Sequence, residues 1–175
     1  MAVVVFLKGV NVGGYRSFRP SELAKQLKRY DVVNIGAAGT LVVRKRIARA
    51  KLLKELKRRL PFEAEIMMCS GEDILRLVAS APFEGIPAGR NIIHFVSVLG
   101  KRPKSSASFP LHLPPDGVWG VRVMGQQNKF IYGMHRREMK AIGHLGRLEK
   151  IFGTKATTRS WSTIVAIARV LQPKS

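Results

Sequence analysis

The chain opens with an unbroken apolar run, and this run constrains the fold most. Residues 3–6 are Val, Val, Val and Phe, which favour β-strands. A strand that is apolar at every position is typical of the centre of a sheet, where both faces are buried. The glycines Gly9, Gly13 and Gly14 then indicate a loop. We therefore expect residues 3–6 to form a central strand.

The next segments alternate between helical and strand patterns. The predicted elements are a helix from residue 20, strands at 32–35 and 41–43, a helix at 48–60 and a strand at 64–68. Leu23, Ala24 and Leu27 recur at helical spacing in the first helix, and Pro61 ends the second. The order strand, helix, strand, strand, helix, strand is that of a ferredoxin-like α/β plait, in which two helices cover an antiparallel sheet.

The rest of the chain repeats this plan in degenerate form. We expect a short helix at 74–78 that Ser70 and Asp73 begin as a capping box, a strong strand at 91–99, an irregular loop at 101–117, a hairpin at 118–123 and 130–132, and helices at 145–152 and 161–171. The sequence therefore predicts an α+β protein of two ferredoxin-like halves with antiparallel sheets. Residues 1–70 form the first half, 71–90 connect, and 91–175 form the second.

Composition restricts the class of protein. The chain of 175 residues is 46% hydrophobic, which is enough for a core and excludes wholesale disorder. Lys and Arg number 31 against 11 Asp and Glu, so the net charge of +20 favours anionic partners. A solvated surface without a partner is the alternative. A single cysteine and the lack of an 18-residue apolar stretch predict a cytoplasmic protein without a membrane span.

The glycine loop is one candidate for an anion site. Lys8, Asn11, Gly13 and Gly14 lie between a predicted strand and a predicted helix, where backbone N–H groups and a helix N-terminus can hold an anion. The loop lacks the ending of a P-loop and the spacing of a dinucleotide fingerprint. The alternative is that its glycines only provide turn conformations.

A second candidate is Arg159, within a hydroxyl-rich segment at residues 157–163. Ser160 as the N-cap of the last helix explains much of this segment without a ligand. Arg159 then pairs with an acidic neighbour, or meets a phosphate together with free helix N–H groups. We predict that the glycine loop and Arg159 border one cleft.

Nine basic residues within positions 44–59 form a third candidate, and Arg49, Lys54, Arg58 and Arg59 represent its surface. A basic helical face matches the phosphate repeat of nucleic acid without reading bases. No aromatic residue lies between Arg44 and Pro61, so any binding of nucleic acid is expected to be weakly selective.

Catalytic and metal sites find little support. The four histidines lack the spacing of a metal site, and His94 within a strand is typical of a packed histidine. Cys69 has no partner in a CxxC motif, and acidic residues are too scarce for a two-metal centre. We expect no metal and no cofactor, and the sequence assigns no catalytic residue. A nucleophilic pair of Cys69 and His144 stays open.

Two segments carry a resemblance to a known family. They are residues 6–14 (FLKGVNVGG) and residues 148–153 (LEKIFG) followed by 157–163 (TTRSWST). On these the chain resembles a family of bacterial proteins known as domain of unknown function 1697. The resemblance implies two α/β plait halves, and it implies no established activity, cofactor or substrate.

The chain departs from that family in two places. Where the family usually has a Ser, Gly, Asn turn, residues 37–40 keep only Gly39, and the family's Ser and Lys before the first C-terminal helix are replaced near Ala141 and Ile142. If those polar groups line a family pocket, this chain has lost part of it.

The leading hypothesis is a non-catalytic protein whose basic surface binds nucleic acid or another polyanion through the helix at 48–60. The alternative is a small-anion or phosphate-ligand binding protein, or an enzyme, that uses the glycine loop and Arg159. A structural or protein-interaction module is the third class.

Overall fold

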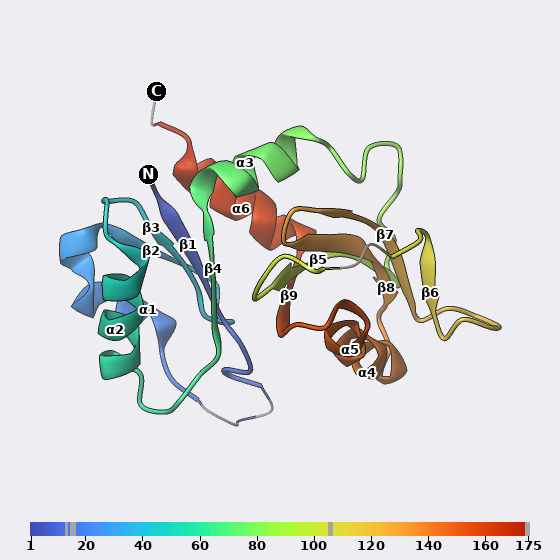
Figure 1. Cartoon of the computed structure of the whole chain (residues 1–175), viewed down its shortest axis with the longest axis horizontal. Coiled ribbons are helices and arrows are strands. Elements are labelled where there is room, and N and C mark those ends of the chain that lie inside the picture. The colour runs from blue at the N-terminus through green and yellow to red at the C-terminus, as the bar shows by residue number, and fades with distance from the viewer. Residues whose placement is uncertain (13, 15–16, 105–106, 174–175) are drawn as a thin grey trace. The chain divides into compact units, whose positions relative to one another are not determined.

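The computed structural model describes residues 1–12, 14, 17–104 and 107–173. They form an α+β protein with two antiparallel sheets, which confirms this part of the predicted fold class (Figure 1). Two compact units contain one sheet each. Unit 1 comprises Met1–Ser80 together with Thr163–Ser175, and unit 2 comprises Ala81–Ser162.

Unit 1 contains a sheet with the strand order β2-β3-β1-β4. Its elements are β1 (Val3–Leu7), α1 (Pro20–Gln26), the 3-10 helix η1 (Lys28–Tyr30), β2 (Val32–Ile35), β3 (Thr40–Val43), α2 (Arg49–Arg59), β4 (Ile66–Ser70) and α3 (Gly71–Ala79), and most of α6 (Trp161–Leu171) returns to it. Strand β1 pairs antiparallel with both β3 and β4, so the apolar run forms a central strand as predicted.

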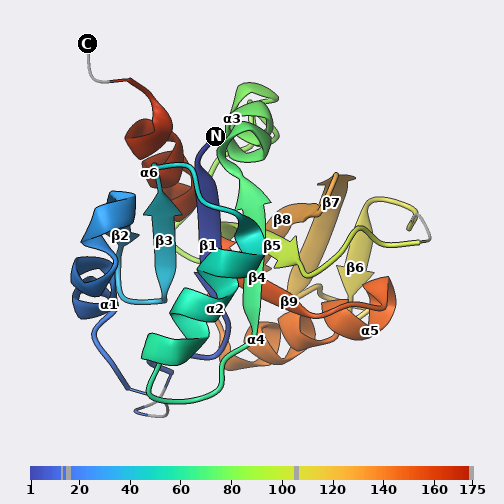
Figure 2. The same ribbon diagram turned by 60° about the vertical axis from the view of Figure 1, so that its left-hand side comes forward.

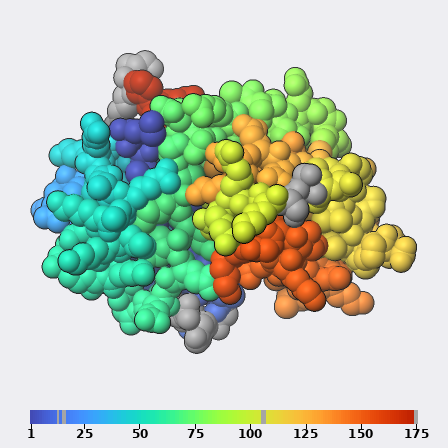
Figure 3. All heavy atoms as spheres, viewed as in Figure 1, coloured from blue at the N-terminus to red at the C-terminus, as the bar shows by residue number. Residues whose placement is uncertain are grey.

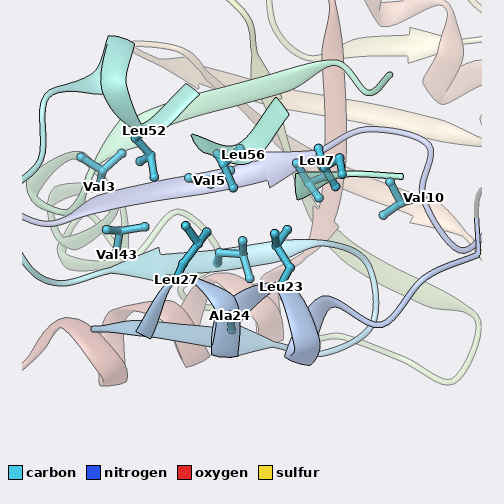
Figure 4. Packing of buried hydrophobic residues seen from close by; sticks show 12 residues of the cluster. Val3, Val5, Leu7, Val10, Leu23, Ala24, Leu27, Val43, Leu52 and Leu56 are labelled. Carbon is cyan, nitrogen blue, oxygen red and sulfur yellow. The ribbon is translucent and has the colours of Figure 1, made fainter. Parts of the chain in front are cut away.

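The core of unit 1 lies between one face of this sheet and the helices α1 and α2. Figures 1 and 2 show both helices on the same side of the sheet. Val5 and Leu7 of β1 pack with Leu23 of α1 and Leu56 of α2 in one cluster of buried side chains (Figure 4). Phe6, which points to the opposite face, is also fully buried. Burial of both faces explains why the sequence of β1 is apolar throughout.

Helix α3 begins as its sequence predicts. The Ser70 hydroxyl accepts a hydrogen bond of 3.1 Å from the backbone N–H of Asp73, which satisfies one of the free donors of the first turn. The end of α6 lies against this turn, because a Cβ added to Gly71 would stand 2.8 Å from Leu171 Cδ2. Among the described residues, no helix has the length and apolar character to cross a membrane.

Unit 2 contains a sheet with the strand order β6-β7-β8-β5-β9. Its elements are β5 (Ile92–Leu99), β6 (Leu111–Leu113), β7 (Val121–Gln127), β8 (Phe130–Arg136), α4 (Met139–Gly146), α5 (Leu148–Phe152) and β9 (Ala156–Ser160). Phe95 of β5 packs in one buried cluster with Ala141 of α4 and Leu148 of α5, so both helices cover the same face. The predicted hairpin is present as β7 and β8.

Three predictions for unit 2 need correction. Residues 156–160 form the strand β9, which pairs antiparallel with β5 and which we did not predict. Helix α6 begins at Trp161, as predicted. The expected irregular loop contains β6, and helix α4 begins at Met139 rather than near residue 145. In each case pairing with another strand, or packing on the sheet, outweighs the local pattern.

Candidate functional site

Of the three candidate sites that the sequence predicts, the one with the most residues is the solvent-exposed side of α2. We define the α2 basic face as its five exposed cations, Arg49, Lys51, Lys54, Lys57 and Arg58. The three basic residues just before the helix, at positions 44–46, are exposed as well. Figure 3 shows this segment, in teal, at the surface of unit 1. Three of the four residues that represented the predicted surface, Arg49, Lys54 and Arg58, are thus accessible.

Arg58 and the fourth residue, Arg59, contact the only acidic residue of α2, Glu55. Glu55 Oε2 lies 2.6 Å from Arg59 Nη1 and 3.0 Å from Arg29 Nη2, and Glu55 Oε1 lies 3.7 Å from Arg58 Nη2. The side chain of Arg59 is only 17% exposed, whereas that of Arg58 is 66% exposed. Arg58 is therefore available to a partner, whereas Arg59 mainly pairs with Glu55 one turn earlier in the same helix.

The carboxylate of Glu55 stays charged within this network. Burial raises its pKa, but the guanidinium of Arg59 lowers it, Arg58 and Arg29 add to this, and the net pKa is below the ordinary value. Because Arg29 comes from the segment after α1, the network also joins two parts of unit 1 that are distant in the sequence. The sequence prediction grouped Arg59 with the exposed cations although Glu55 stands four residues before it, a spacing that allows this pair. Only the contact of Arg29 with Glu55, across 26 residues, has no local signal.

The glycine loop is held by the side chain of Asn11. Its Oδ1 accepts a hydrogen bond of 2.8 Å from the backbone N–H of Phe18, and its Nδ2 donates one of 2.7 Å to the carbonyl oxygen of Ala37. Gly14 has φ +77°, a conformation that favours glycine. The Asn11 amide therefore has a structural role in the loop.

Lys8, at the start of the loop, takes part in an ion pair. Lys8 Nζ lies 3.8 Å from Glu65 Oε2, and its side chain is 30% exposed. Gly13 lies outside the described residues. An anion site at this loop stays a prediction.

Arg159 is part of the buried side of β9. It is 7% exposed, and its Nη1 donates hydrogen bonds to Thr157 Oγ1 at 2.8 Å and to the carbonyl oxygen of Thr158 at 3.0 Å. Burial lowers the pKa of Arg159 to about 10, so the guanidinium is still charged at neutral pH. Asn11 belongs to unit 1 and Arg159 to unit 2. The common cleft that we predicted for them stays a prediction.

An aromatic cluster in unit 2 was not found from the sequence. The ring of Phe83 stacks on His94 with centroids 4.3 Å apart and planes at 7°, and the edges of Trp161 and Tyr132 approach Phe83 at 5.1 and 6.1 Å. Burial lowers the pKa of His94. His94 is thus a packed histidine, and Trp161 has a packing contact. The four residues are too far apart in the sequence to give a signal.

The described residues offer no candidate metal site. Within the part of the chain that the structure describes, no three His, Cys, Asp or Glu side chains gather in a way that could hold an ion. Cys69 is buried in β4.

Comparisons with known proteins agree with the architecture. Residues 1–119 match the model of a family described as "Protein of unknown function (DUF1697)". The conserved bacterial protein SP0830 from Streptococcus pneumoniae has a similar structure, with a TM-score of 0.57, 16% sequence identity and 98% of each chain covered. At this identity the likeness concerns the fold alone. No curated protein matches the chain.

Proposed function

Because the chain belongs to the DUF1697 family of proteins of unknown function, we propose a function from its own surface: the α2 basic face binds the phosphate backbone of nucleic acid without reading the base sequence. The observation that carries this proposal is the exposure of all five cations of the face on a helix that the core of unit 1 holds in place.

The spacing of the cations suits a regular polyanion. Lys51, Lys54 and Arg58 stand at positions i, i+3 and i+7, so they project from one side of the helix. With about 1.5 Å of rise per residue, Lys51 and Arg58 are roughly 10 Å apart along the axis. One strand of a nucleic acid carries a phosphate about every 3.4 Å of its axis. The face can therefore contact about three successive phosphates.

The charge distribution of α2 also favours an anion as partner. Its first turn contains Arg49 and Lys51 and no acidic residue, and Ala48 at the N-cap provides no side-chain hydrogen bond. Cations at a helix N-terminus oppose the helix dipole, at a cost of about 0.3–1 kcal/mol each. The burial of Leu52 and Leu56 offsets this cost. A bound phosphate would relieve the repulsion that packing otherwise has to overcome.

The binding is expected to be weak at physiological salt and strongly dependent on salt. With five cations on the face, the logarithm of the affinity for duplex DNA should fall with the logarithm of salt concentration with a slope of about −4.5. Changing Arg49, Lys54 and Arg58 together to Gln should reduce this slope by about 2.7, since each lost phosphate contact removes about 0.9. Fluorescence anisotropy with labelled oligonucleotides over a salt series measures both slopes.

A matched control changes three exposed cations of unit 2, Arg90, Lys140 and Arg147, to Gln, which removes the same net charge. This control should keep nearly the full slope, and oligonucleotides of different sequence should bind alike. Arg59 is left unchanged in both proteins because it pairs with Glu55. If the salt slope falls equally in the two variants, α2 has no specific role. If the parent protein does not bind oligonucleotides at low salt, the proposal as a whole is contradicted.

We further infer that both units are ferredoxin-like plaits. The element order β1, α1, β2, β3, α2, β4 and the strand order β2-β3-β1-β4 support this for unit 1. In unit 2 the strands β7-β8-β5-β9 have the equivalent order, and the segment that contains β6 stands where the first helix of a plait would be. On this plan α2 is the second of the two helices that cover the sheet of unit 1.

The alternative function, a small-anion site that uses the glycine loop and Arg159, can be tested against a purely structural role of Arg159. The Arg159 guanidinium is buried and bonded to Thr157 and Thr158. We expect Arg159→Ala to lower the free energy of unfolding by about 1–3 kcal/mol, since it leaves buried partners without a donor. Phosphate binding, measured by titration calorimetry, should not change.

Arg147→Ala serves as the control for Arg159→Ala, because Arg147 is exposed and its replacement should leave the melting temperature nearly unchanged. The opposite pattern for Arg159→Ala, with an unchanged melting temperature and weaker phosphate binding, would favour the small-anion site.

A further inference from the structure

We propose that unit 2 contains an anion site of its own, a concavity between the loop after β5 and the end of α5 that takes the phosphate groups of a polyphosphate. Its volume is about 290 Å³. We define the unit 2 basic pocket by its four cationic lining residues, Lys101, Arg102, Lys104 and Lys150. The remaining lining residues are Pro103, Ile151, Phe152, Gly153 and Thr154. This proposal does not rest on the function proposed for α2.

The sheet holds the two walls of the pocket together. Leu99, the last residue of β5, pairs with Ala156 of β9, and the N–H of Gly100 donates a hydrogen bond of 2.7 Å to the carbonyl oxygen of Lys155. A Cβ added to Gly100 would lie 3.3 Å from Thr154 Oγ1, so the loops approach closely here. The cations therefore extend from two backbone segments whose separation is set by strand pairing.

The end of α5 is fixed in the same way. Gly153 has φ +65° and ends the helix, and the N–H of Thr154 donates to the carbonyl oxygen of Glu149 at 3.2 Å. The carboxylate of Glu149 accepts a hydrogen bond of 2.9 Å from the N–H of Ala156. Glu149 thus joins α5 to β9.

Arg102 is positioned by a neutral partner. Its Nε and Nη2 donate hydrogen bonds of 3.1 and 2.8 Å to Oδ1 of Asn128, in the turn between β7 and β8. An amide oxygen orients the guanidinium but does not neutralise its charge. A planar, oriented guanidinium is the side chain best suited to phosphate oxygens.

The charge around the pocket is of one sign. Among the described residues that line it, four are basic and none is acidic. Lys101 and Lys150 also line an adjoining concavity of about 480 Å³. Lys155 and Glu149 line this second concavity as well. Like charges around one hollow repel each other, and the exposed Lys101, Lys104 and Lys150 gain little from burial in return. A bound anion removes this repulsion.

The size and chemistry of the pocket indicate a short polyphosphate. A volume of 290 Å³ corresponds to about ten water molecules at roughly 30 Å³ each. It lies at the lower limit for small-molecule sites. Phe152 is only 4% exposed, so it offers no face on which a base could stack. The site therefore recognises the phosphate chain, whether it is free or belongs to a nucleotide.

Titration calorimetry of the full chain with tripolyphosphate tests the proposal. We expect one site per chain, with binding that is stronger than for orthophosphate because more charge-assisted hydrogen bonds form. The double variant Lys101→Ala, Lys150→Ala should weaken tripolyphosphate binding at least about tenfold. The double variant Lys51→Ala, Lys54→Ala removes the same charge from α2 and should change it less than about twofold. All four lysines are exposed, so both variants should keep the melting temperature of the parent protein.

Two further arms decide the source of the phosphate groups and the independence of the site. If ATP binds as tightly as tripolyphosphate, the nucleoside contributes nothing and the ligand is the phosphate chain; tighter binding of ATP identifies a nucleotide. The double variant Lys51→Ala, Lys54→Ala is also tested with an oligonucleotide. If it loses oligonucleotide binding but still binds tripolyphosphate, the pocket is independent of the function proposed for α2. The proposal is overturned if both double variants weaken tripolyphosphate binding equally, or if the parent protein does not bind tripolyphosphate in low salt.

Discussion

A Gly133→Ala variant is expected to lose at least about 3 kcal/mol of folding free energy, the upper end of the usual cost of overpacking a core. Gly133 lies in β8, where it pairs with Phe95 of β5 and Val123 of β7. An added Cβ would overlap the carbonyl oxygen of Arg122 and stand 2.9 Å from the Cα of Val123. Both are backbone atoms, so no side-chain rotation relieves the clash. Strand β7 would have to move away from β8.

Urea unfolding followed by circular dichroism measures this loss, and Gly143→Ala is the matched control. Gly143 lies within α4, is exposed, and a Cβ there would meet no atom within 4 Å. Because alanine favours a helix over glycine, the control should gain up to about 1 kcal/mol. Similar stability of the two variants would show that β7 and β8 accommodate a methyl group, and would contradict the close approach at Gly133.

Leu56→Ala is expected to have the second-largest effect, a loss of about 2.7–5 kcal/mol. Leu56 is fully buried and belongs to the cluster that joins α2 to β1 (Figure 4). Its truncation removes apolar contacts and leaves a cavity under the helix that carries the α2 basic face. The same urea experiment measures the loss.

Lys57→Ala, one residue further along α2, is the control for Leu56→Ala. Lys57 is exposed, so its replacement should change the stability by less than about 0.5 kcal/mol. Well below its melting temperature, the Leu56→Ala protein should still bind oligonucleotides, since its cations are unchanged. A loss below about 1 kcal/mol would mean that packing of Leu56 does not anchor the helix.

The candidate sites differ in how much of each the sequence could predict. The α2 basic face follows from local pattern alone, because an amphipathic helix places apolar and basic residues on opposite sides. The contact of Arg29 with Glu55 does not, because the two residues are 26 positions apart. The pair of Glu55 and Arg59 has a local i,i+4 spacing, but their low exposure depends on packing in the folded chain. Strand β9 was also missed. Its residues Ala, Thr, Thr, Arg and Ser do not alternate between apolar and polar, and an arginine, Arg159, takes a buried position, so its pattern is not that of an ordinary strand.

The sequence by itself determined the elements whose own residues decide their conformation. The apolar run of β1, the amphipathic α2 and the cap at Ser70 each depend on neighbours within a few positions. Only the tertiary structure decided which distant residues share a site. The unit 2 basic pocket exists because Leu99 pairs with Ala156, which brings the loop at residues 101–104 beside the end of α5. Strand register is a property of two segments at once, and neither segment encodes it alone.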